Sequence, residues 1–154
     1  MFAAHPRTWC LLLVLAAGCD PLGGPGPLAE ACEHLTALPS ELSAGASASS
    51  APAVATHTHY QMRLPAVGGG RGGLVRYTSI IRGQLLVLLS QDLPVRLAPA
   101  MGSEITPRDS GKGGPCPEIA AWYDYDVGVG DQLITVGGAG VTATAVDLVL
   151  ESEP

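Results

Sequence analysis

Three histidines have the residue type and spacing best suited to binding a metal ion. His57 and His59 stand two apart in an alternating stretch, so a β-strand would project both rings from one face, about 6.5 to 7 Å apart. His34 would add a third imidazole nitrogen if its segment packs nearby. Imidazole nitrogens are good ligands for Zn(II) and Cu(II). The histidines therefore predict a zinc or copper site, and the alternative is a polar strand face in contact with water.

Trp122 indicates a second kind of binding site. It alternates with apolar residues in the stretch 119–127, so it would share the outer face of a strand with Asp124 and Asp126. An indole ring can stack under the apolar face of a sugar, while carboxylates accept hydrogen bonds from the sugar hydroxyls. These side chains therefore predict a glycan platform. The alternative is that Trp122 lies beneath a helix or a long loop as an extension of the core.

The remaining motifs favour a protein that is not an enzyme. Residues 124–131 resemble the start of a calcium loop, but Val129 stands where that loop needs glycine and Thr135 where it needs glutamate. The run 68–73 has dinucleotide-type glycine spacing, yet strands are expected on both sides of it, which indicates a hairpin. No G-x-S-x-G motif is present. We therefore expect neither catalysis, a calcium site nor a nucleotide cofactor.

The charge pattern argues against a nucleic-acid partner. The chain of 154 residues has 8 Lys and Arg against 14 Asp and Glu, a formal net charge of -6. Lys112 is the only lysine, and the arginines are scattered singly. Binding to a phosphate backbone requires clustered basic side chains, so we expect no nucleic acid to bind.

Short β-strands must position these candidate residues. From residue 56 onward, alternating or apolar runs are separated by Gly, Pro and Asp, as in all-β domains. Seven strands are expected, at residues 57–64, 74–81, 84–89, 95–98, 119–127, 132–136 and 141–150. Residues 99–118 form the one long loop, and no connection has room for a crossover helix. The pattern predicts a mainly β fold, a seven-stranded antiparallel β-sandwich preceded by a short helix.

The expected helix lies at residues 28–38, ahead of the strands. Four apolar side chains share one face at helical spacing: Leu28, Cys32, Leu35 and Leu38. Residues 43–55, rich in Ser and Ala, are expected to form a flexible connector. The run 85–89 is apolar at every position, which predicts a central strand covered on both faces, with the helix on one of them.

The first 19 residues have the layout of an export signal. Arg7 precedes the apolar run 11–17, which is too short to span a bilayer. The run ends in Leu15-Ala16-Ala17-Gly18-Cys19, which resembles the lipobox of bacterial lipoproteins. The resemblance implies cleavage before Cys19, a lipid anchor on its thiol and a place on a membrane of the cell envelope. The alternative is an ordinary secretory signal with a soluble product.

The same resemblance leaves two cysteines for the mature chain. Cys10 would leave with the signal and Cys19 would carry the lipid, so Cys32 and Cys116 remain. In an oxidising compartment they would most simply pair with each other. We therefore expect a disulfide, and the alternative is two free thiols.

Three segments are expected along the chain. They are a signal peptide at 1–18, a lipidated linker region with the short helix at 19–55, and the β-sandwich at 56–154. The order of elements in the sandwich is similar to the jelly-roll modules of the pre-peptidase C-terminal type, which implies a non-catalytic module. The features that carry the similarity are an alternating first strand, a Gly-opened strand with Tyr77, the run 83–89, Val127-Gly128-Val129-Gly130 before a strand, and a final strand ending at Leu148-Val149-Leu150-Glu151.

Two functions follow from these expectations. The first is a lipid-anchored envelope β-sandwich with a binding or structural role, whose partner would be an envelope polysaccharide or another protein. The alternative is an envelope lipoprotein that binds zinc or copper through its histidines.

Overall fold

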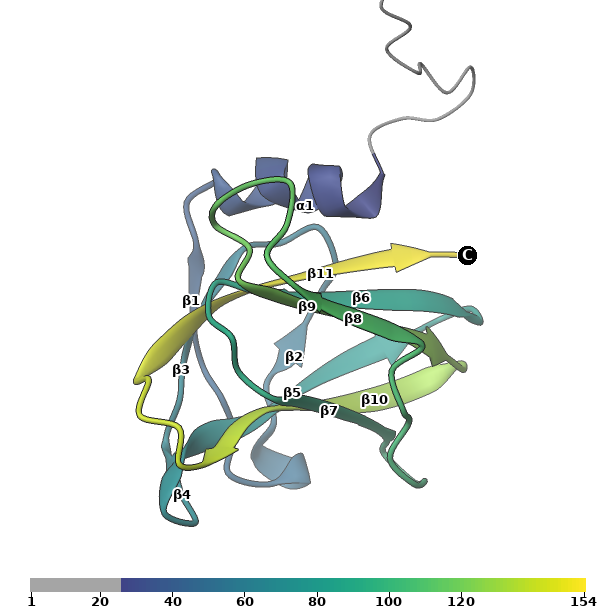
Figure 1. Ribbon diagram of the computed structural model, residues 1–154. Helices are drawn as coiled ribbons and strands as arrows, with labels where there is room; N and C mark the ends of the chain where they lie inside the picture. Colours follow the sequence, from purple (N-terminus) through teal and green to yellow (C-terminus); the bar gives the residue numbers. More distant parts are fainter. Residues whose placement is uncertain (1–25) are drawn as a thin grey trace, which may run out of the picture.

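Two β-sheets packed face to face form the body of the protein, and one short helix lies across an outer face (Figure 1). The computed structural model describes residues 26–154. One sheet has six strands in the order β1-β3-β11-β6-β9-β8, and the other has five in the path β2-β5-β10-β7 with β4 paired to β5. The helix, α1, spans Pro27–Leu35 and crosses the six-stranded sheet.

The strand bounds follow the two sheets. The six-stranded sheet contains β1 (Ser40–Ser43), β3 (Tyr60–Arg63), β11 (Ala145–Glu153), β6 (Gly83–Leu89), β9 (Ala121–Val127) and β8 (Asp109–Lys112). The five-stranded sheet contains β2 (Ala53–Val54), β5 (Gly70–Ser79), β10 (Gly130–Ala139), β7 (Val95–Pro99) and β4 (Ala66–Val67). A short 3-10 helix, η1, spans Ala48–Ser50.

The predicted mainly β sandwich is confirmed, but the prediction of seven antiparallel strands is wrong. Each predicted strand is present, and β1, β2, β4 and β8 bring the total to eleven. Because β1 runs parallel to β3 and β2 parallel to β5, both sheets are mixed. The extra strands are short and have little apolar pattern of their own, so their neighbours determine their pairing. Two of them lie before residue 56, within the part of the chain expected to be helix and connector.

The glycine-rich run 68–73 forms the hairpin that the sequence predicts. It joins β4 to β5, with Ala66 opposite Arg71. Gly68 and Gly69 turn the chain at φ values of 48° and 84°, in the left-handed region that glycine adopts at little cost.

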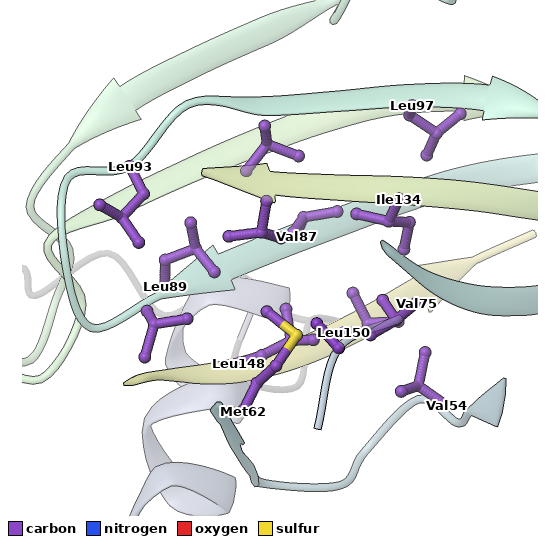
Figure 2. Close-up of a cluster of buried hydrophobic side chains, with 14 of the residues drawn as sticks. Val54, Met62, Val75, Val87, Leu89, Leu93, Leu97, Ile134, Leu148 and Leu150 are labelled. Carbon is purple, nitrogen blue, oxygen red and sulfur yellow. The ribbon is translucent and has the colours of Figure 1, made fainter. Parts of the chain in front are cut away.

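Apolar side chains from both sheets fill the space between them (Figure 2). Leu85, Val87 and Leu89 of β6 point into this core, as the alternation along a strand requires. Tyr125 is its largest fully buried side chain, and its hydroxyl donates a hydrogen bond to the Val95 carbonyl, 3.2 Å away. The sandwich core therefore buries apolar surface and leaves its tyrosine hydroxyl satisfied.

The outer face of β6 is apolar as well, and the helix covers it. Leu86 and Leu88 form a second cluster with Ala31 of α1 and Val149 of β11. This confirms that β6 is a central strand with the helix over one face. Ile119, expected to face the sandwich core, belongs to this outer cluster instead, because β9 begins only at Ala121.

Helix α1 is shorter than predicted and is bonded covalently to a distant loop. It ends at Leu35, so Leu38 is off the apolar face and 96% exposed. Pro39 explains the early end, because the residue before a proline is disfavoured in the helical region. Cys32 and Cys116 form the predicted disulfide, with their Cα atoms 6.0 Å apart.

The expected signal peptide at residues 1–18 and the lipidation at Cys19 lie outside the described residues. Within residues 26–154, no helix has both the length and the apolar character needed to cross a membrane.

Candidate metal centre

Four side chains meet where α1 lies against β11: Glu30, His34, His57 and Glu151. One ligand atom from each lies within 4.8 Å of the others. Nδ1 of His57 is 2.6 Å from Oε2 of Glu151 and 3.6 Å from Oε1 of Glu30. Nε2 of His34 is 3.6 Å from Oε1 of Glu151 and 4.0 Å from Oε1 of Glu30. Neighbouring ligands of a tetrahedral zinc ion lie about 3.3 to 3.6 Å apart, so small side-chain shifts would close this group around one ion.

The helix supplies two of the four ligands from adjacent turns. Glu30 and His34 are four residues apart, so their side chains lie on the same side of α1. Between them, Ala31 is fully buried against the sheet and Cys32 carries the disulfide. The buried alanine and the disulfide fix the helix on the six-stranded sheet. Glu30 and His34 are thereby held at the edge of the interface between helix and sheet.

Glu151 is the buried centre of the group. It follows Val149 by two residues on β11, so it projects toward the helix and not into the sandwich core. It is only 2% exposed. Its Oε2 has one close partner, Nδ1 of His57, whereas within the described residues its Oε1 and Nε2 of His34 make no hydrogen bond. A buried carboxylate left in this state is costly, and a proton or a cation would relieve the cost.

His57 reaches Glu151 through an unusual backbone conformation. Its φ is 56°, and it is the only non-glycine residue among those described with a positive φ. Its backbone N–H donates to the carbonyl of Leu150, 2.9 Å away, which places the ring beside Glu151. A non-glycine residue in this region costs about 1 kcal/mol or more, and such strain is often found at functional sites.

The charges around Glu151 leave its protonation finely balanced. Burial is the largest influence and raises the pKa of Glu151, His57 lowers it and the nearby Glu30 raises it. The resulting pKa is about 7. Near neutral pH the carboxyl group therefore divides between its protonated and ionised forms. A divalent cation would favour the ionised form and displace the proton.

The structure brings His34 and His57 together but places His59 elsewhere. Nδ1 of His59 lies 2.9 Å from the Ala37 carbonyl, and its Nε2 lies 3.1 Å from Oδ1 of Asp147. The expectation that His57 and His59 share a strand face is wrong, because β3 begins only at Tyr60. The left-handed turn at His57 directs its ring to Glu151, while His59 stays with the neighbouring part of β11.

Two members of the group, Glu30 and Glu151, were not among the residues that the sequence identified. Glu30 precedes His34 by one helical turn, so the i, i+4 pair is a readable signal once the helix is assigned. Glu151 follows an apolar stretch on the strand beside β6, and an acid in such a stretch indicates a special environment. Neither signal reveals that the two glutamates meet, since 121 positions along the chain separate them.

The residues of the expected glycan platform have structural partners. Trp122 is half-buried and packs against the second apolar cluster, the one that α1 covers, which we call the helix-side cluster. Gly111 of β8 lies so close that a Cβ on it would be 2.6 Å from the indole, so the strand backbone covers part of the ring. Nη2 of Arg108 donates to Oδ2 of Asp124 over 2.6 Å, while Asp126 is exposed. These contacts favour the alternative in which Trp122 extends the core.

No known protein-family model matches the chain, and no curated protein shows significant sequence similarity to it. What the site can do therefore follows from its own donor atoms. Two imidazole nitrogens and two carboxylates form a set that suits Zn(II), whereas calcium prefers six to eight oxygen ligands.

Proposed function

We propose that this protein binds a divalent transition-metal ion, Zn(II) in the first place, through Glu30, His34, His57 and Glu151. The observation that carries the proposal is the meeting of four nitrogen and oxygen ligands around a buried carboxylate whose Oε1 makes no hydrogen bond. Cu(II) accepts the same donors and is generally bound more tightly, so the metal available to the protein decides between them.

The ligand count supports a binding role over catalysis. Catalytic zinc sites use three protein ligands and keep a position for water or substrate, whereas structural sites are closed by four. Here Glu30 and His34 come from the helix, and His57 and Glu151 from the sandwich. The bound ion would therefore join the helix to the sandwich. The disulfide at Cys32 ties down the same helix.

The sequence also suggests where in the cell the protein works. We propose that the domain is a lipoprotein of the cell envelope, attached through Cys19, and that the sandwich is a jelly-roll-like, non-catalytic module. The lipobox-like residues 15–19 support the anchor. A Cys32–Cys116 disulfide is typical of an oxidising compartment outside the cytoplasm and supports export.

Calorimetric titration of the metal-free protein with Zn(II) tests the binding function. We expect one ion per chain and, for Glu30→Gln and His57→Gln, an affinity lower by more than about tenfold, since even loss of an outer-shell partner has an effect of that size. Glu30 and His57 are about half exposed, so both variants should fold.

His59→Gln is the matched control for this titration. It changes the same residue type two positions away, outside the group, and should leave the zinc affinity unchanged. Absence of stoichiometric binding, or an equal loss in His59→Gln, would contradict the proposal.

A further inference from the structure

One end of the sandwich presents apolar side chains to water. Five large apolar residues are exposed among residues 26–154, and four of them lie in the turns at this end. We call these four residues the apolar tip: Ile80 (84% exposed), Ile81 (52%), Met101 (98%) and Val129 (66%). Single exposed apolar residues are common on proteins, but a group of them marks an interaction surface.

The three turns that carry the apolar tip lie beside one another. They follow β5, precede β10 and follow β7, and these strands are adjacent in the order β5-β10-β7. Gly130 pairs with Ser79, and the N–H of Ala100 donates to the Asp131 carbonyl over 2.8 Å. Because neighbouring strands are about 4.8 Å apart, the turns project from one compact area.

Buried polar side chains hold two of these turns in place. The Ser79 hydroxyl, 4% exposed, donates to the Ile81 carbonyl over 2.5 Å. The side-chain amide of Gln132, 1% exposed, donates to the carbonyls of Gly128 and Gly130 over 3.1 and 3.3 Å. These hydrogen bonds hold the turns in conformations that expose Ile80 and Val129 to water. Ordered turns with exposed apolar side chains are typical of a surface that another body covers.

The N-terminal part of the chain enters the structure at the same end. Pro27, the first residue of α1, lines a small hollow with Gln84 and Glu153, next to the turn that carries Ile80 and Ile81. In Figure 1 the start of α1, the C terminus and the connection into β6 all lie on the right-hand side. The proposed lipid attachment at Cys19 lies eight residues before Pro27, and that stretch can extend over at most about 30 Å. The proposed anchor and the apolar tip are therefore within reach of one membrane surface.

We propose that the apolar tip docks on a lipid bilayer and inserts its four side chains into the interfacial region. Protruding turns suit a bilayer, which has no fixed shape to match, and apolar area buried at the interface drives such binding. Arg82 is the one base in the turn after β5, while Asp126 and Asp131 flank the neighbouring turn. This balance favours a neutral, zwitterionic surface over an anionic one. The proposal rests in part on the proposed lipid anchor at Cys19 and is independent of the metal site.

Tryptophan fluorescence of the full chain mixed with phosphatidylcholine vesicles tests the docking. Ile80→Trp and Val129→Trp place a reporter in two of the turns, and emission from the native tryptophan Trp122 is subtracted with the unmodified protein. We expect the added emission to shift to shorter wavelength and to lose most of its intensity when the acyl chains carry bromine. Leu38→Trp is the matched control, since Leu38 is at least as exposed as the reporter positions but lies beyond the other end of α1.

The reporters separate docking of the tip from other attachment. If the chain floats with the vesicles while both tip reporters keep their emission, the tip stays in water and the proposal is wrong. Equal quenching of the Leu38→Trp reporter, absence of flotation, or self-association that alone accounts for the tip signal would overturn it as well.

Discussion

The two faces of the six-stranded sheet are covered in different ways. The inner face packs against the second sheet through a large cluster of apolar side chains, including Leu85, Val87 and Leu148. The outer face packs against a helix of nine residues through a few, centred on Ala31, Leu88 and Val149. Isolated helices of this length are marginal in water, so a small apolar contact alone is a weak attachment.

Strand β11 contributes side chains to both faces, and they differ in character. Leu148 and Leu150 point into the sandwich core, while Val149 and Glu151 point toward the helix. Only on the helix side does the strand bury an acid. The disulfide and the Glu–His group occur on this side too. The weaker apolar layer is therefore the one held by specific contacts, to which the proposed metal centre would add another.

Leu148→Ala should cause the largest loss of stability. Leu148 is fully buried in the inner core, and truncation of such a leucine costs about 2 to 5 kcal/mol in the free energy of unfolding. Leu35→Ala removes the same atoms from a half-buried helix position and should cost less. Urea unfolding measures both, and an equal or larger loss in Leu35→Ala would contradict the contrast between the faces.

Removal of the disulfide should affect both stability and metal binding. The bridge joins residues 84 positions apart, and Cys32→Ser with Cys116→Ser should lower the free energy of unfolding by about 2 to 4 kcal/mol. Zinc affinity should fall as well, because Glu30 and His34 flank Cys32 on the helix. Urea unfolding and calorimetry check the two effects. An unchanged zinc affinity would mean that the helix keeps its place without the bridge.

The pH dependence of stability should report the buried acid. The pKa of Glu151 in the folded protein, about 7, lies above the ordinary value of 4.5, so the folded state binds the proton more tightly than the unfolded state. The metal-free protein should therefore lose stability as pH rises from about 4.5 to about 7. Glu151→Gln stays neutral and should lack this part of the slope.

Urea midpoints between pH 4.5 and 7.5 measure that difference, with His34, His57 and Glu30 unchanged in both proteins. Zinc, which binds the ionised carboxylate, should raise the unfolding temperature more at pH 7.5 than at pH 5.5. Parallel pH curves for the parent and Glu151→Gln would show that Glu151 is not the titrating group.

The smallest effect concerns Trp122. Because its ring packs under β8 and beside the helix-side cluster, soluble envelope oligosaccharides should leave its fluorescence unchanged. Release of the helix by reduction of the disulfide should shift the emission to longer wavelength. A saturable change with oligosaccharide in the oxidised protein would restore the glycan platform as a function.

The sequence predicts much of the scaffold and half of the candidate metal centre. Alternation and apolar runs locate the main strands, and the continuous run 85–89 correctly identifies a strand covered on both faces. Strands β1 and β8 could not be found in this way, because their pairing depends on neighbours distant in the sequence. Strand alternation points to His57 as a candidate ligand but not for the right reason, since a left-handed backbone conformation directs its ring. Glu151 could not be identified from the sequence, because its role depends on which residues of the sheet the helix covers.

X-ray absorption spectroscopy at the zinc edge tests the metal centre most directly. For the zinc-loaded, disulfide-bonded protein, the account predicts two imidazole nitrogens and two carboxylate oxygens at about 2.0 to 2.2 Å, with no sulfur at about 2.3 Å. One imidazole should disappear in His34→Ala and none in His59→Ala. Sulfur ligands, a shell made mostly of water, or loss of an imidazole in His59→Ala would show that Glu30, His34, His57 and Glu151 do not bind the ion.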